Sequence, residues 1–142
     1  MASKEKQINI SLVILSWPLR NAYFKLLSDL GYTVQSSYTN GKEMIANFAN
    51  DAFPDIILID ADREEAVALE TVCWLRKHHP TVKILAFTLE GEEALIKPLI
   101  DNGAHGYLCK AAESDEIKRA IKRVHEKGFY IPPLNPWRLR RC

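Results

Sequence analysis

Short apolar runs alternate with segments of helical period along most of this chain. The runs lie at Ile8 to Leu15, Tyr32 to Ser36, Ile56 to Ile59, Val82 to Phe87 and Tyr107 to Cys109. Strands joined by helical crossovers form a parallel sheet that is covered by helices on both faces. The alternation therefore predicts an α/β fold with a doubly wound five-stranded parallel sheet in a three-layer sandwich.

Helices are expected between the runs and after the last one. They are predicted over the apolar stripe Leu19 to Leu30, after the Asn40 N-cap, over Glu64 to His78, around Pro98 and after a Ser114 N-cap. Gly31 and Gly128 follow two of them, as glycine often does at a helix end. Pro98 removes one backbone hydrogen bond and crowds the preceding turn, so that helix is predicted to be short, kinked or late in starting.

Composition excludes several classes of protein. The 142 residues carry a net charge of +1 and are 47% hydrophobic, which indicates one ordinary globular domain without the basic excess of a nucleic-acid binder. The apolar stretch before Ser16 is only about eight residues long, too short to span a membrane, and it lacks a cleavage signal. We expect a cytoplasmic protein with no membrane partner.

Three chemically active side chains follow three of the predicted strands. Asp60 follows the third strand, Thr88 the fourth and Lys110 the fifth. Ligands of doubly wound sheets bind at the carboxyl ends of the strands. Each residue alone has an ordinary structural explanation, as a helix cap, a strand end or an ion pair, but together they indicate a functional crevice.

Around these residues the sequence resembles the CheY-like receiver domains of bacterial response regulators, a flavodoxin-like fold. The segments PDIILID, ending at Asp60, and GAHGYLCK, ending at Lys110, carry the resemblance, and KGFYIPP after the last helix points to the NarL/LuxR subgroup. The similarity covers residues 7–131. Residues 132–142 are then a tail, or the start of a linker to an output domain.

The resemblance implies a role for each residue of the crevice. It makes Asp60 the phosphoacceptor, Thr88 and Lys110 the phosphoryl-contacting residues, and Tyr107 the aromatic switch residue. It further implies a two-component phosphorelay that controls an output such as transcription, with a histidine kinase as partner. DNA would be bound only through an output domain outside this chain, and the domain itself would regulate rather than act as an enzyme.

The sequence departs from the family where the metal binds. Receivers carry two acidic residues at the end of the first strand, but here that pair is Ile14-Leu15, Leu15-Ser16 or Ser16-Trp17, depending on the alignment. Mg²⁺ prefers several oxygen ligands, so we expect weak or no Mg²⁺ binding at Asp60. Asp62 is the candidate for a second carboxylate, although in the family this position offers mainly its backbone carbonyl.

Three further differences surround the crevice. Arg63-Glu64 replaces the Met-Pro of the family, Leu89 replaces a small residue and Ala111 replaces a frequent proline. The bulk of Leu89 would narrow access to Asp60. With the missing acidic pair, these differences predict an atypical receiver whose Mg²⁺-dependent phosphorylation is impaired or lost.

Other functions fit the same architecture. One is a phosphorylation-independent interaction module, and another is a small flavodoxin-like phosphatase or nucleotide-binding protein. The latter is disfavoured because Ser16-Trp17-Pro18 cannot cradle a phosphate with successive backbone N–H groups. The leading interpretation is a receiver that forms a homodimer through the Pro98 helix, the strand Tyr107 to Cys109 and the helix after Ser114.

One prediction concerns Lys110. Without a metal, its ammonium is expected to pair directly with the Asp60 carboxylate across the crevice. Removing one partner leaves the other partly buried and unpaired, so Lys110→Met should lower the free energy of unfolding by roughly 1 to 3 kcal/mol. Urea denaturation measures this change, and an unaltered midpoint would contradict the pairing.

Overall fold

The computed structural model describes residues 7–48, 52–61, 65–88, 93–109 and 112–130. Within these residues, five parallel strands form one sheet in the order β2-β1-β3-β4-β5. The strands are β1 (Asn9–Val13), β2 (Thr33–Tyr38), β3 (Ile56–Asp60), β4 (Lys83–Thr88) and β5 (Gly106–Cys109). The helices are α1 (Trp17–Asp29), α2 (Gly41–Phe48), α3 (Glu65–His78), α4 (Glu93–Asp101) and α5 (Ser114–Lys127). The predicted fold class is confirmed.

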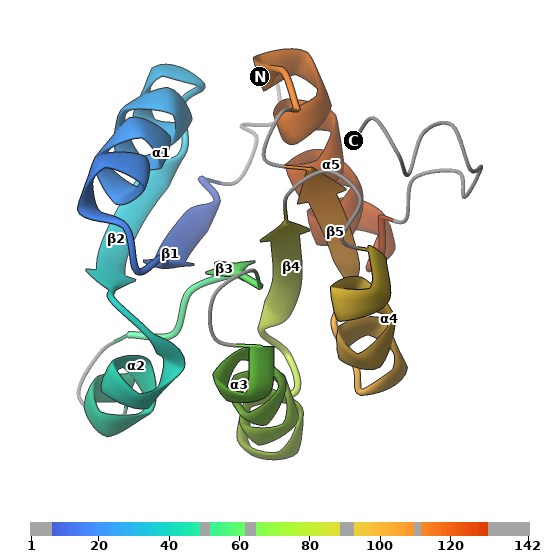
Figure 1. Cartoon of the computed structure of the whole chain (residues 1–142). Helices are drawn as coiled ribbons and strands as arrows, with labels where there is room; N and C mark the ends of the chain where they lie inside the picture. Colours follow the sequence, from blue (N-terminus) through green and yellow to red (C-terminus); the bar gives the residue numbers. More distant parts are fainter. Residues whose placement is uncertain (1–6, 49–51, 62–64, 89–92, 110–111, 131–142) are drawn as a thin grey trace.

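The helices cover both faces of the sheet, as Figure 1 shows. Successive side chains of a strand point to opposite faces, and β3 follows this rule with apolar residues throughout. Ile56 and Leu58 belong to the core under α1 and α5, whereas Ile57 and Ile59 belong to the core under α2, α3 and α4. Because both faces of β3 are buried, the sequence of this strand is an unbroken apolar run from Ile56 to Ile59.

Most of the predicted helix ends are confirmed. For α1 no N-cap was predicted; Ser16 caps this helix, and its Oγ accepts a hydrogen bond from the Leu19 N–H at 3.3 Å. Asn40 caps α2, where its Oδ1 accepts the Glu43 N–H at 2.9 Å. Gly31 and Gly128 have φ values of 97° and 87°, the left-handed conformation expected after a helix. The helix α4 is short, as predicted, and contains Pro98.

The start of α5 differs from its prediction. Glu113 is the N-cap residue and makes no side-chain capping bond, whereas Ser114 is already the first helical residue. The Glu113 carbonyl accepts hydrogen bonds from the Glu116 and Ile117 N–H groups, both at 3.0 Å. The first hydrogen bonds of the helix are thus accepted one residue before the serine, so the prediction of a Ser114 cap is wrong.

The turn between α4 and β5 is held by His105. The Ile84 N–H donates to His105 Nδ1 at 3.0 Å, and the His105 N–H donates to the Ile84 carbonyl at 2.8 Å. Burial lowers the pKa of His105 from its usual 6.5 to about 4, and the positive charges of Lys83 and Arg76 add to this effect. The neutral ring is the form that can accept the Ile84 proton, because a protonated imidazole only donates.

This geometry predicts a pH dependence of stability. Between pH 6.5 and about 4 the unfolded chain binds a proton at His105 that the folded chain does not, so acid favours unfolding in this window. His105→Asn keeps an acceptor near Nδ1 but does not titrate. Its free energy of unfolding should therefore fall less than that of the wild type as the pH drops through this range.

Denaturation at a series of pH values checks this expectation. His125→Asn, which replaces a partly exposed histidine of α5, is the matched control and should follow the wild type. An identical acid dependence in His105→Asn and the wild type would contradict the role of the ring.

Candidate functional site

Two of the three residues predicted at strand ends, Asp60 and Thr88, lie at the carboxyl edge of the sheet. Asp60 is half-buried at the end of β3, Thr88 is buried at the end of β4, and Tyr107 is buried within β5. In register, Asp60 lies opposite Phe87, the residue before Thr88. The remaining predicted residues, Lys110 and Asp62, lie outside the described residues, as do Arg63, Glu64, Leu89 and Ala111.

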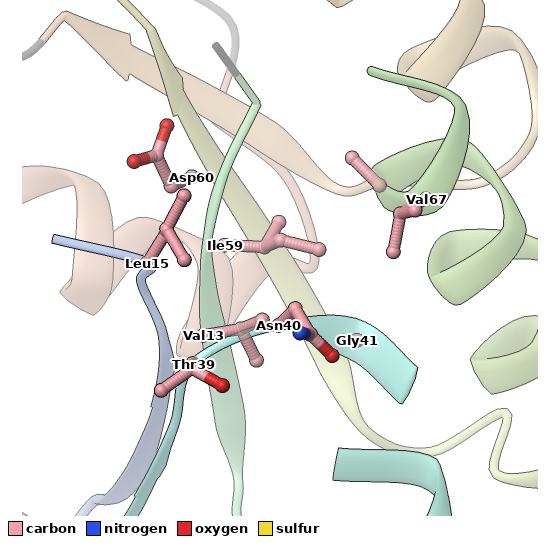
Figure 2. A pocket seen from close by; sticks show the side chains of 9 residues that line it. Val13, Leu15, Thr39, Asn40, Gly41, Ile59, Asp60 and Val67 are labelled. Atoms are coloured by element: carbon pink, nitrogen blue, oxygen red, sulfur yellow. The ribbon is translucent and has the colours of Figure 1, made fainter. Parts of the chain in front are cut away.

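A small pocket adjoins Asp60 on the side of α2 and α3. Its water-accessible volume is about 20 Å³, room for roughly one water molecule. The wall consists of Val13, Leu15, Thr39, Asn40, Gly41, Ile59, Asp60, Val67 and Ala68. In Figure 2 the Asp60 carboxylate points away from Thr39 and Asn40, and Leu15 lies next to it. Leu15 and Asp60 therefore line the same pocket.

The structure bears on which two residues of this chain stand where receivers carry their acidic pair. Leu15 lines the pocket together with Asp60, so it stands where a carboxylate could reach the same ligand. Ser16 instead caps α1, and Trp17 is 63% exposed on that helix. The alternatives that contain Leu15 therefore agree with the structure better than Ser16-Trp17 does.

A basic residue of α1 approaches the end of β1. The Arg20 guanidinium is half-buried and donates through Nη1 to the Ile14 carbonyl at 2.7 Å and to the Leu15 carbonyl at 3.4 Å. Carbonyl oxygens are hard ligands of the kind that Mg²⁺ uses, and Arg20 already binds these two. The sequence interpretation missed Arg20, although its position one turn after the Ser16 cap could have indicated that it faces back toward the strand.

A second residue of α1 was also missed. Tyr23 is 6% exposed, and its ring packs on Phe87 with a centroid distance of 4.9 Å. Burial, together with the negative charge of the nearby Asp60 carboxylate, raises the pKa of Tyr23 from its usual 10 to about 12. The α1 helix thus presents a neutral phenol on the β4 residue opposite Asp60.

These side chains fit a bound Mg²⁺ poorly. Among the described residues, no group of three or more His, Cys, Asp or Glu side chains could hold a metal ion. Of the described residues that line its pocket, Asp60 is the one carboxylate, and the alkyl side chain of Leu15 lines the same pocket after the end of β1. What this arrangement offers chemically is a nucleophilic carboxylate with a buried hydroxyl on the next strand, at the edge where doubly wound sheets bind ligands.

Across the described part of the chain, no helix is both long and apolar enough to cross a bilayer.

Comparison with known families gives a match over most of the chain. A family model described as the response regulator receiver domain matches residues 18–122. The transcriptional regulatory protein LnrK of Bacillus subtilis (strain 168) is 33% identical over 105 residues, which are 70% of this chain and 47% of LnrK. A nitrate/nitrite response regulator protein homolog of Haemophilus influenzae is 33% identical over 115 residues, 80% of this chain and 55% of the relative. The chain spans about half the length of these curated relatives.

Solved structures show the same fold. A LuxR-family two-component response regulator from Aurantimonas sp. SI85-9A1 superposes with a TM-score of 0.76 at 24% identity, covering 92% of this chain and 91% of that one. The isolated REC domain of RcsB from Salmonella enterica serovar Typhimurium, solved with the phosphomimetic BeF3-, gives a TM-score of 0.75 at 14% identity. That alignment covers 89% of this chain and 94% of the REC domain.

Proposed function

Because this chain belongs to the response regulator receiver family, we propose that it is an atypical receiver that signals by docking or dimerisation and whose Mg²⁺-dependent phosphorylation is impaired. The coarse function follows from the family: the chain is the receiver domain of a two-component response regulator. Its proposed role is regulatory, with no turnover of a small-molecule substrate.

The observation that carries the impairment is the position of Leu15. An alkyl side chain lines the pocket beside the Asp60 carboxylate, and Arg20 binds the carbonyl oxygens of Ile14 and Leu15. Phosphoryl transfer relies on a cation to neutralise the charge that develops on the transferred group. A site whose described residues offer one carboxylate and a hydrocarbon neighbour should bind that cation weakly, so the transfer is proposed to be slow.

The chain keeps the residues that are proposed to carry out the phosphoryl chemistry. Asp60 is the nucleophile, because its carboxylate ends β3 at the edge where ligands of this fold bind. The Thr88 hydroxyl and the Lys110 ammonium are proposed to hold the phosphoryl oxygens, and Tyr107 to act as the aromatic switch. A histidine kinase is the proposed phosphoryl donor.

The output is proposed to lie outside this chain. LnrK is a transcriptional regulatory protein by name, and one superposed structure is an RcsB–DNA complex, so relatives act on transcription. We propose that this receiver controls an output of the same kind, with DNA contacts made by another domain.

A second candidate is an interaction module that never uses Asp60 as a phosphoacceptor. The position of Leu15 in the Asp60 pocket also favours this candidate, since a site that does not bind Mg²⁺ can persist for structural reasons without being phosphorylated. Incubation with acetyl phosphate and Mg²⁺, followed by intact-protein mass spectrometry, separates the two. A phosphoryl adduct that is absent in Asp60→Asn supports the atypical receiver, and no adduct after long incubation supports the module.

The metal prediction follows from the same geometry. The unmodified protein should bind Mg²⁺ with a dissociation constant above about 1 mM, which corresponds to a favourable binding free energy of less than about 4 kcal/mol. The double variant Leu15→Asp with Ser16→Asp should bind Mg²⁺ at least about tenfold more tightly, because position 15 lines the pocket that contains Asp60 and position 16 adds a second carboxylate next to it. Calorimetry or Trp17 fluorescence measures both constants.

The matched control carries asparagine at positions 15 and 16. It has the same size and keeps a side-chain cap for α1, but it adds no charge, so its Mg²⁺ affinity should stay near that of the wild type. A wild-type dissociation constant for Mg²⁺ well below about 1 mM would refute the proposed impairment.

The proposed homodimer uses the face formed by α4, β5 and α5. On α5 the exposed basic residues are Lys118, Arg119, Lys122, Arg123 and Lys127. On α4 the described acidic side chain is Asp101, and it pairs with Lys97 at 3.0 Å within the same helix. Glu92 and the side chain of Glu93 lie outside the described residues, so the basic face of α5 is the better supported half of this interface.

The dimer prediction is tested by sedimentation velocity. At about 100 μM in low salt, well above a micromolar dissociation constant, the protein should sediment as a dimer, and high salt should shift it toward the monomer. Lys122→Glu with Arg123→Glu should produce the same shift without salt. Lys25→Glu, on the exposed face of α1, is the control, and a wild type that stays monomeric would remove dimerisation from the proposal.

A further inference from the structure

The outer edge of β5 carries a contact with the segment that follows α5. β5 is the last strand in the order, with β4 as its neighbour, and Tyr130 forms a parallel bridge with Gly106 on the opposite edge. The Tyr107 N–H donates to the Tyr130 carbonyl at 3.2 Å, and the Tyr130 N–H donates to the His105 carbonyl at 2.9 Å. A single residue beyond the end of α5, Tyr130, thus continues the hydrogen-bond ladder of the sheet.

Gly106 makes this approach sterically possible. A Cβ atom at this position would lie 2.2 Å from the Tyr130 carbonyl oxygen, and its next nearest atoms would be the Tyr130 carbon and nitrogen at 3.1 Å. The backbone of Gly106 is not in the left-handed region, so its conformation does not require glycine. What requires glycine is the space that the Tyr130 backbone occupies.

Both sides of the bridge are anchored. The Tyr130 side chain packs against the core under α1 and α5, and its hydroxyl donates to Glu116 Oε2 of α5 at 3.4 Å. On the strand side, His105 is bonded to Ile84 of β4 through both its ring and its backbone. The contact therefore joins β4, β5 and Tyr130 in one continuous network.

We infer that the outer edge of β5 is a docking edge for the chain's own segment after α5, held at Tyr130, and that this pairing ties the Tyr107 backbone to the position of residue 130. Any displacement of β5 at Tyr107 then moves residue 130 with it, because the two backbones share hydrogen bonds. The inference does not depend on the chemistry of Asp60, and it holds whether or not that residue is phosphorylated.

Amide hydrogen exchange on the full 142-residue chain tests the docking edge. Gly106→Ala places a methyl group against the Tyr130 carbonyl, and Tyr130→Pro removes the N–H that donates to His105. In both variants the Tyr107 amide should exchange at least about tenfold faster than in the wild type, because its acceptor is displaced. The amides of Leu85 and Phe87 in β4 should keep their protection, which verifies that the sheet is folded.

Two control variants separate the backbone pairing from the side chains. Tyr130→Phe removes the hydroxyl but keeps the backbone, and Phe129→Ala shortens a neighbour that is 57% exposed and has no part in the bridge. Both should retain the slow exchange of Tyr107. The wild type alone also tests the inference, since its Tyr107 amide must exchange more slowly than a free edge amide.

Three outcomes would overturn the inference. The first is a wild-type Tyr107 amide that exchanges at the rate of an unprotected one. The second is protection of Tyr107 that survives in Gly106→Ala or Tyr130→Pro. The third is protection that rises with protein concentration, which would mean that a second copy, rather than the chain's own segment, occupies the edge.

Discussion

The burial of β3 on every side is the constraint on which the rest of the molecule depends. This strand is hydrogen-bonded to β1 and β4, and its residues from Ile56 to Ile59 are at most 1% exposed. A strand in that position cannot slip by one residue without moving its side chains into the wrong layer. Its end is therefore fixed relative to both neighbours, and Asp60 is placed at the carboxyl edge with little freedom.

The proposed change in the chemistry of Asp60 requires no change in the architecture of the receiver fold. The chain has the strand order of a receiver, while Arg20 of α1 binds the Ile14 carbonyl at the end of β1 and Tyr23 of α1 packs on Phe87 of β4. The guanidinium occupies carbonyl oxygens that a divalent cation would otherwise use, in agreement with the proposed weak binding of Mg²⁺. Fold and chemistry are thus separable here, since the sheet that positions Asp60 is independent of the groups that would activate it.

The fold was predictable because hydrophobic period is a local signal. The five strands and five helices follow from runs such as Ile56 to Ile59 and stripes such as Leu19 to Leu30, and both were found where the sequence indicated. Details that depend on a neighbouring turn were less accessible. Glu113 takes the cap position predicted for Ser114, and β2 extends to Tyr38, two residues beyond its apolar run.

The candidate site was predictable only in part. Asp60 and Thr88 could be assigned because their places at strand ends are visible in the chain order. Arg20 and Tyr23 could not, because their contacts with Ile14 and Phe87 depend on how α1 packs against the sheet. The pairing of Lys110 with Asp60 stays a prediction.

The bridge at Tyr130 also bears on where this domain ends for practical purposes. A shortened chain that stopped at Gly128 would keep every strand and helix described above but would leave the outer edge of β5 without its partner. Open strand edges recruit strands from other molecules, and glycine at position 106 offers no side chain to hinder such pairing. Self-association of such a truncated protein in solution would then be an artefact of the cut and not a property of the signalling domain.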